Sequence, residues 1–294
     1  MGHATSSSGL AGARVASGGG GEIEAGIQRR RRERARREKI GAFVYPVGMM
    51  VALLVIWEAA SRLFSIPAYL VPAPSAIVLS MDTNSAVLIK ESIATTFEIL
   101  LGFALSVAVG VPLALAIYLW RPFARAVYPV LVSSQAVPKV AVAPLFLVWF
   151  GFGLLPKVLI AFLIAFFPVV INTAMGLAAL EREKIYLAQS MGFGPVATFF
   201  KIQLPNAMPS IFAGLKISIT FAVVGAVVGE FVGSNSGIGY VMQRSIGTFD
   251  LPTMFAALVI LALLGVILFW IVDRIEKLVV PWHVSQREEI ILTA

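Results

Sequence analysis

The sequence contains no cysteine and only two histidines among its 294 residues. Disulfide frameworks, thiolate metal sites and cysteine nucleophiles are therefore excluded, and a histidine-rich metal centre has too few ligands. Charge is also scarce, because 13% of the residues are charged whereas ordinary globular chains carry roughly 25%. A hydrophobic content of 59% and a mean hydropathy of +0.89 instead indicate a protein embedded in a lipid bilayer.

Motifs for nucleotide hydrolysis and covalent catalysis are missing as well. No G-x-x-x-x-G-K-[ST] loop occurs, and the nearest glycine-rich string, residues 233–239, has no lysine and reads as a turn. H-E-x-x-H and G-x-S-x-G are absent, and the acidic residues within apolar segments are spaced singly. We therefore expect no enzymatic activity, no cofactor and no metal ion. Energy for uphill transport would come from an ion gradient or from another subunit.

The N-terminal segment differs in composition from the rest of the chain. Residues 1–21 are mostly Ser, Gly and Ala, and eight of the eleven residues from Arg29 to Lys39 are basic. We expect residues 1–40 to form a disordered cytoplasmic tail without a removable signal peptide. The basic run directly precedes the first apolar segment, which predicts an anchor on anionic membrane lipid. Nucleic-acid binding is the alternative, and we do not expect it.

Six apolar segments are long enough to cross ~30 Å of hydrocarbon as helices. The expected spans are Phe43–Phe64, Ser92–Leu119, Ala126–Val148, Lys157–Ala179, Pro209–Val232 and Thr253–Ile275. They predict an all-α, polytopic membrane domain over residues 41–282, followed by a short cytoplasmic tail, 283–294. Lysine and arginine are concentrated on the N-terminal face, seventeen against four, so we expect both termini in the cytoplasm of an inner-membrane protein.

The connecting segment Leu180–Met208 is too polar to span a membrane and too rich in helix formers to be a slack linker. We expect two short helices around Gly192 and Gly194-Pro195, the second ending before Leu204-Pro205. Exposed apolar surface of this kind is typical of a docking site for a partner, and a hairpin lying on lipid headgroups is the alternative. The side chains expected to form this surface are Leu187, Met191, Phe199, Phe200 and Ile202.

Polar residues inside spans are costly, which makes them candidates for lining a translocation path. Lys139 stands out, because an ammonium group at a helix centre costs ~2.5–3.5 kcal/mol unless it is paired or hydrated. It lies between Pro138 and Pro144, where the helix can break. Lys216 and Glu98 are instead expected to reach the membrane interface by extending their side chains. The path candidates are Ser133, Ser134, Gln135, Lys139, Asn172 and Thr173, although serines and threonines also bond to their own helix backbone.

Several separated motifs resemble those of one protein family. Ala188, Gly192 and Ile202-Gln203-Leu204-Pro205 reproduce the E-A-A-x3-G-x9-I-x-L-P signature of ABC importer membrane subunits. The chain resembles the nitrate/sulfonate/taurine/bicarbonate branch, which also contains permeases for thiamine-precursor pyrimidines. Motifs that carry the narrower resemblance are Val137-Pro138-Lys139-Val140-Ala141-Val142-Ala143-Pro144-Leu145-Phe146, Trp149-Phe150-Gly151-Phe152-Gly153, Gly237-Ile238-Gly239-Tyr240, Phe255-Ala256-Ala257-Leu258 and Pro281-Trp282.

The resemblance implies a type I (MetI-like) importer fold with six transmembrane helices. It further implies two copies of this subunit, two ABC ATPase subunits, and an extracytoplasmic binding protein that delivers a small polar or anionic solute. The segment at about 181–208 would be the coupling loop, and its glutamate position is occupied by Tyr186, so an acidic contact would come from Glu181 or Glu183. An ion-gradient-driven secondary transporter is the alternative. The implied ATPase contacts are Tyr186, Leu187, Ala188, Gly192, Ile202, Leu204 and Pro205.

Overall fold

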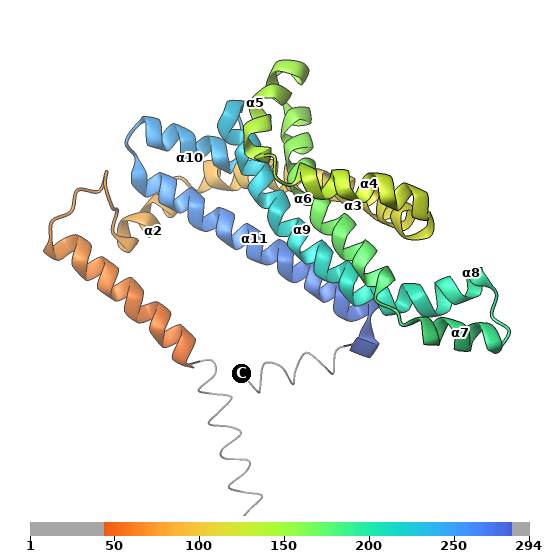
Figure 1. The fold of residues 1–294 in the computed structure, drawn as a ribbon. Helices are drawn as coiled ribbons and strands as arrows, with labels where there is room; N and C mark the ends of the chain where they lie inside the picture. The colour runs from red at the N-terminus through yellow and green to blue at the C-terminus, as the bar shows by residue number, and fades with distance from the viewer. Residues whose placement is uncertain (1–43, 284–294) are drawn as a thin grey trace, which may run out of the picture. The chain divides into compact units, whose positions relative to one another are not determined.

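The computed structural model describes residues 44–283, and every regular element in that range is helical. The expected tails, 1–40 and 283–294, lie outside the described residues apart from His283. After a first helix, Val44–Leu63, the elements are α2 (Pro74–Thr83), α3 (Ser85–Leu119), α4 (Arg121–Ser134), α5 (Lys139–Phe150), α6 (Leu154–Ala178), α7 (Arg182–Ser190), α8 (Pro195–Thr198), the π-helical turn η1 (Phe199–Gln203), α9 (Leu204–Gly233), α10 (Ile238–Gly247), α11 (Leu251–Val279) and the 3-10 turn η2 (Pro281–His283) (Figure 1).

The chain divides into two compact units, residues 1–66 and residues 67–294, and each is described by itself. In the first unit, the helix Val44–Leu63 has 20 residues, enough to cross a membrane, and its side chains are almost all exposed. Its one described ion pair joins Arg62 to Glu58 at 2.6 Å, one turn apart. Because so few of its side chains are buried, side-chain packing within this unit contributes little to the stability of the helix.

Five of the six expected spans are confirmed as long apolar helices within residues 44–283. The expected third span is different: α4 and α5 are separate helices bent by 96° at the break between them. The break falls at Pro138, which has no N–H to continue the helix and disfavours helical backbone in the residue before it. This part of the chain is a broken span or a re-entrant segment.

The second helix of the expected loop also departs from the prediction. It does not end at Leu204-Pro205, because α8, η1 and α9 form one continuous helix of 39 residues, Pro195–Gly233. The wider π-helical turn ends at Gln203, two residues before Pro205, whose ring in a regular α-helix would clash with the carbonyl group of Lys201.

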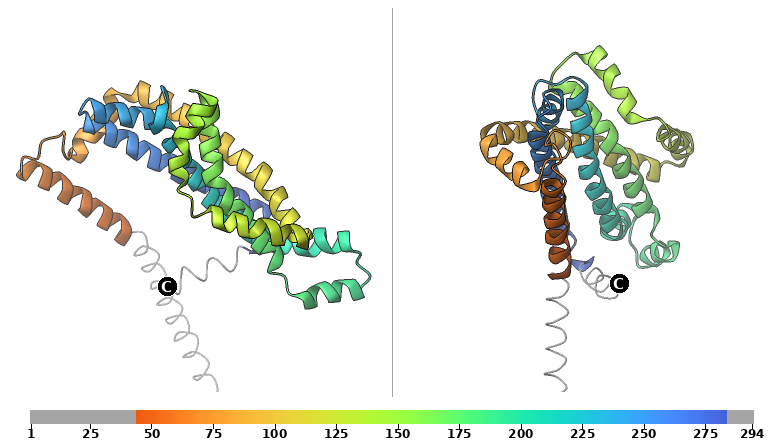
Figure 2. Two further views of the ribbon diagram at one scale, coloured as in Figure 1. Left: turned by 45° about the horizontal axis from the view of Figure 1, so that its top comes forward. Right: turned by 90° about the vertical axis from the view of Figure 1, so that its left-hand side faces the viewer.

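The core of the second unit is the contact between α6 and α9, which run side by side in both views of Figure 2. The helices approach so closely that a Cβ at Gly225 would lie 2.6 Å from Cα of Ala161. Small residues at helix contacts allow this distance, as is common in membrane proteins. Around the contact lie buried apolar side chains of α3, α9 and α11, including Ile99, Phe212, Ile219 and Leu268.

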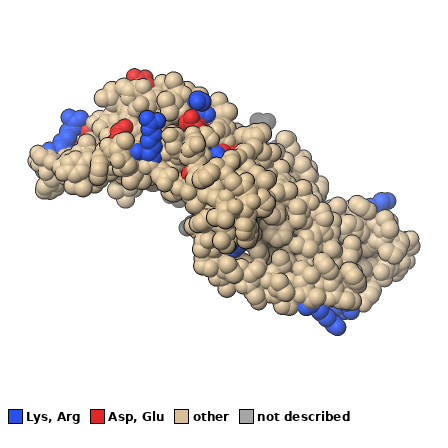
Figure 3. Space-filling view, turned by 90° about the horizontal axis from the view of Figure 1, so that it is seen from above, with Lys and Arg blue, Asp and Glu red and all other residues tan. Residues whose placement is uncertain are grey.

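Two charged residues lie deeper than the sequence indicates. Lys216 was expected to extend to the interface, but its Nζ lies 2.8 Å from Oε2 of Glu276 and 3.3 Å from Oδ1 of Asp273. Glu98 was expected to do the same, but its carboxylate is buried and paired with Lys157. In both cases a partner from another helix compensates the charge, so extension is not required. Most of the surface in Figure 3 carries no charged side chain, as contact with lipid requires.

Candidate functional site

The α7–α8 hairpin, residues 182–203, is built around a backbone turn that requires glycine at position 192. Gly192 has φ of +86°, and the N–H groups of Gly192 and Phe193 donate to the carbonyl oxygens of Gln189 and Ala188 at 3.0 and 3.1 Å. This pair of bonds is a Schellman motif, in which a left-handed residue ends a helix. A Cβ at Gly192 would meet nothing within 4 Å, so its conformation, and not crowding within the chain, demands glycine.

The hairpin projects beyond the helices that carry it (Figure 1), and several of its apolar side chains are exposed. Phe199, expected on this surface, instead packs with Leu204 against the buried cluster of Leu177, Ala207 and Ile211. Ala188 is 2% exposed, and Ile202 is half-buried. The apolar surface of the hairpin is formed by Tyr186, Leu187, Met191, Val196 and Phe200, each between 61% and 70% exposed.

The six path candidates do not gather at one place. Ser133 and Gln135 are exposed at the break between α4 and α5, and the hydroxyl of Ser134 donates to the carbonyl oxygen of Leu131. Asn172 donates to the carbonyl oxygen of Pro168 in its own helix. Thr173 is 1% exposed, and its hydroxyl has no hydrogen-bond partner among the described residues.

Lys139 is the first residue of α5 and is partly buried. Its Nζ lies 4.5 Å from the centroid of the Phe167 ring of α6, a cation–π contact. The structure therefore places Lys139, Ser133 and Gln135 at the broken span, and Asn172 and Thr173 within α6.

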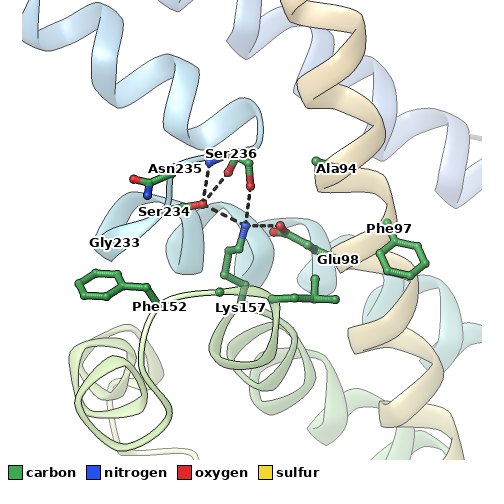
Figure 4. Close-up of a pocket in the computed structure, with 11 residues that line it drawn as sticks. Ala94, Phe97, Glu98, Phe152, Lys157, Gly233, Ser234, Asn235 and Ser236 are labelled. Carbon is green, nitrogen blue, oxygen red and sulfur yellow. Dashed lines mark hydrogen bonds and ion pairs between the residues drawn. The ribbon is translucent and has the colours of Figure 1, made fainter.

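A polar cluster that the sequence did not indicate lies at the other end of α6 from the hairpin. Glu91 and Glu98 of α3 and Glu230 of α9 are each at most 8% exposed. Buried Lys157, near the start of α6, donates to Glu98. Lys157 also donates to the hydroxyl oxygens of Ser234 and Ser236, at 3.0 and 3.3 Å (Figure 4).

The glycine-rich string does form a turn, and its amides bind carboxylates of the same chain. The N–H of Gly237 donates to Oε2 of Glu91 at 2.6 Å, and the N–H of Ile238 donates to Oγ1 of Thr95 at 2.8 Å. The hydroxyl of Thr95 in turn donates to Oε1 of Glu230 at 2.6 Å. These bonds satisfy the amides that open α10 and tie that helix to α3 and α9.

A cavity of about 360 Å³ lies beside this cluster, lined by side chains that include Phe97, Glu98, Phe152, Lys157 and Asn235 (Figure 4). Within residues 44–283 no group of three or more His, Cys, Asp or Glu side chains is arranged to hold a metal ion. Because α6 has 25 residues, the cavity and the hairpin lie about 37 Å apart along the helix.

Comparison with known proteins gives consistent similarities. The family model for the binding-protein-dependent transport system inner membrane component matches residues 106–281. The formylaminopyrimidine transport permease ThiX of Halalkalibacterium halodurans is 38% identical over 82% of this chain and 96% of its own length. The riboflavin transport permease RibX of Chloroflexus aurantiacus is 37% identical over 82% and 90%. An inward-facing MetNI methionine ABC transporter matches in fold, with a TM-score of 0.59 at 20% identity over 66% of this chain and 97% of that chain.

Proposed function

Because this chain belongs to the family of binding-protein-dependent transport system inner membrane components, we propose that it forms the solute path of an ATP-driven importer as a pair of identical copies. It is a multi-pass, non-catalytic membrane subunit of an ABC transporter, with the type I importer fold. Two separate ATPase subunits and an extracytoplasmic binding protein complete the proposed assembly, with both termini of this chain in the cytoplasm.

The observation that carries the proposal is the exposed apolar surface of the α7–α8 hairpin. Exposed apolar side chains on a projecting helical hairpin favour a protein partner. We propose that Tyr186, Leu187, Gly192, Ile202 and Pro205 lie at or directly behind the contact with the ATPase. Ala188 and Leu204, both more deeply placed, support the hairpin and not the contact surface.

The solute is proposed to be small and polar. Two relatives of similar identity are named for formylaminopyrimidine and riboflavin, which supports planar nitrogen heterocycles as the first class to test. Sulfonates, taurine, nitrate and bicarbonate form the second class, on the basis of the motifs in the sequence. Along the path we place the residues at the broken span, Ser133, Ser134, Gln135 and Lys139, ahead of Asn172 and Thr173, which lie in helix contacts.

The absence of cysteine allows a direct test of the hairpin contact. Leu187→Cys places a thiol on the apolar surface of the hairpin, and Phe249→Cys places one at an exposed site between α10 and α11 as a control. With the cognate ATPase present, a bifunctional thiol reagent is expected to cross-link the Leu187→Cys chain to it and to leave the Phe249→Cys chain unlinked. Equal cross-linking of both variants, or of neither, contradicts the proposed contact.

A further inference from the structure

Lys139 is a cation within an apolar span that no described carboxylate neutralises. No Asp or Glu among residues 44–283 lies within 4.0 Å of its Nζ. Two other lysines in helical spans of the second unit behave differently, since Lys157 pairs with Glu98 and Lys216 pairs with Glu276. Beside the Phe167 ring, which stabilises the ammonium group only in part, water or a ligand with an acceptor group would stabilise it further.

The depth of Lys139 follows from its contact with Phe167. That ring belongs to the middle of α6, about 20 Å from the helix start at Leu154 and about 17 Å from its end at Ala178. Lys139 therefore lies beside the middle of α6, and its ammonium group contacts a ring there instead of extending to an end of that helix.

The backbone adds a second positive feature at the same place. Lys139 opens the 12-residue helix α5, and no side chain caps its N-terminus. The N-terminal end of a helix carries the positive end of the backbone dipole, where a cation is unfavourable and an anion favourable. The helix start and the ammonium group thus both favour an acceptor at the break between α4 and α5.

A second copy of the chain does not supply the missing carboxylate. Two copies with the same topology share an axis along the membrane normal, so each residue recurs at its own depth. The buried carboxylates lie toward the ends of the spans and already have partners: Glu91 and Glu230 bind amides near the start of α10, and Glu276 binds Lys216. A pair would bring a second Lys139 to the middle of the membrane.

We propose that Lys139 faces the water-filled path and binds an acceptor group of the solute, an anionic oxygen or a carbonyl oxygen or ring nitrogen of a heterocycle. Cationic solutes are repelled by the two ammonium groups at mid-depth. This inference rests on the proposed function, because it assigns a substrate preference to the same path.

The test uses the full chain in membrane vesicles and a single introduced thiol. Ala136→Cys lies at an exposed position of the break, three residues from Lys139. Three methanethiosulfonate reagents are compared there: the anionic ethylsulfonate, the neutral methyl and the cationic ethyltrimethylammonium compounds. We expect the anionic reagent to react faster than the cationic one, and Lys139→Gln to lower this rate ratio about five-fold or more. The ratio should also fall as salt is added.

Two further variants separate charge from folding. Lys139→Arg keeps the charge and should keep the ratio, whereas Lys90→Gln removes a lysine with an exposed side chain from the start of α3 and should also leave the ratio unchanged. A ratio that Lys139→Gln does not change overturns the inference, as does a thiol at position 136 that fails to react with the neutral reagent. If either result is found while Leu187→Cys cross-links to the ATPase as expected, only the inference about Lys139 is contradicted. If Leu187→Cys does not cross-link, the proposed function is contradicted, whatever the ratio of reaction rates at position 136.

Discussion

The backbone N–H of Gly239 donates a hydrogen bond to Oε2 of Glu230, nine residues earlier, at 2.5 Å. Glu230 is fully buried, and its other oxygen accepts from Thr95 of α3. One carboxylate therefore joins the end of α9, the start of α10 and the N-terminal half of α3. Since the protein would otherwise leave these amides without partners, the start of α10 depends on acidic residues of two other helices.

Gly237→Ala is expected to destabilise this junction. Gly237 has φ of +104°, and a Cβ there would lie 1.9 Å from Oε1 of Glu230. Backbone strain of about 1–3 kcal/mol is added to the displacement of a buried carboxylate, so the melting temperature in detergent should fall. Gly247→Ala, at the end of α10 with nothing within 4 Å of its Cβ, should melt like the wild type. Equal melting temperatures for the two variants would contradict the proposed tie.

Removal of one partner from the buried pair of Lys157 and Glu98 should be costly. Both side chains are at most 5% exposed, so Lys157→Met leaves Glu98 buried without its cation. A loss of about 3–5 kcal/mol in the free energy of unfolding is expected. The double variant Lys157→Met, Glu98→Leu should recover part of that loss. A double-mutant cycle of thermal or denaturant unfolding measures the coupling, and additive effects would count against the pair.

Lys216 of α9 and Lys277 of α11 both contact Asp273, but they should contribute differently to the stability of the protein. Lys216 is 15% exposed and contacts Asp273 and Glu276 from α9, whereas Lys277 is 46% exposed and contacts Asp273 one turn away. Lys216→Met should therefore reduce the free energy of unfolding by about 3 kcal/mol, and Lys277→Met by about 0–1 kcal/mol. Unfolding of both variants in the same detergent checks this order, and a reversed order would refute it.

Gly192→Ala tests the turn of the α7–α8 hairpin. At φ of +86° an alanine costs roughly 1–2 kcal/mol, which tilts the hairpin away from the Schellman geometry without affecting the distant helices. Membrane levels should stay normal while ATP-dependent uptake falls. Gly194→Ala is the matched control, because Gly194 has φ of −71° and an open Cβ position. Equal uptake by the two variants would show that the turn is not needed for coupling.

Local patterns predicted the helices and the hairpin well. Continuous apolar segments gave five spans directly, and Gly192 with Gly194-Pro195 indicated the turn that the structure contains. The third segment contains a helix break, which Pro138 and Pro144 indicated, but the bend of 96° between α4 and α5 could not be predicted from hydropathy, which averages over the break. The prediction that Phe199 belongs to the exposed apolar surface was wrong. The side on which this short helix packs depends on its contact with α9, which the local sequence does not indicate.

The polar cluster could not be predicted from spacing. Thr95 and Glu230 are 135 residues apart, and Glu91 and Gly237 are 146 apart, so no local pattern relates them. Each acidic residue alone resembles a side chain that extends to the interface, as Glu98 did. One usable signal was present: several charged residues fell near the same ends of different spans, where compensation by a partner is cheaper than exposure to lipid.

We propose that this chain has no energy source of its own and receives work through the α7–α8 hairpin. The most direct measurement is solute accumulation in sealed proteoliposomes containing the chain with or without its cognate ATPase, using the solute that the accompanying binding protein binds. Accumulation against a gradient is expected only when ATPase, ATP and binding protein are all present, and it should be lower with the Gly192→Ala chain. Uphill accumulation by the chain alone, driven by an imposed ion gradient, would contradict the account.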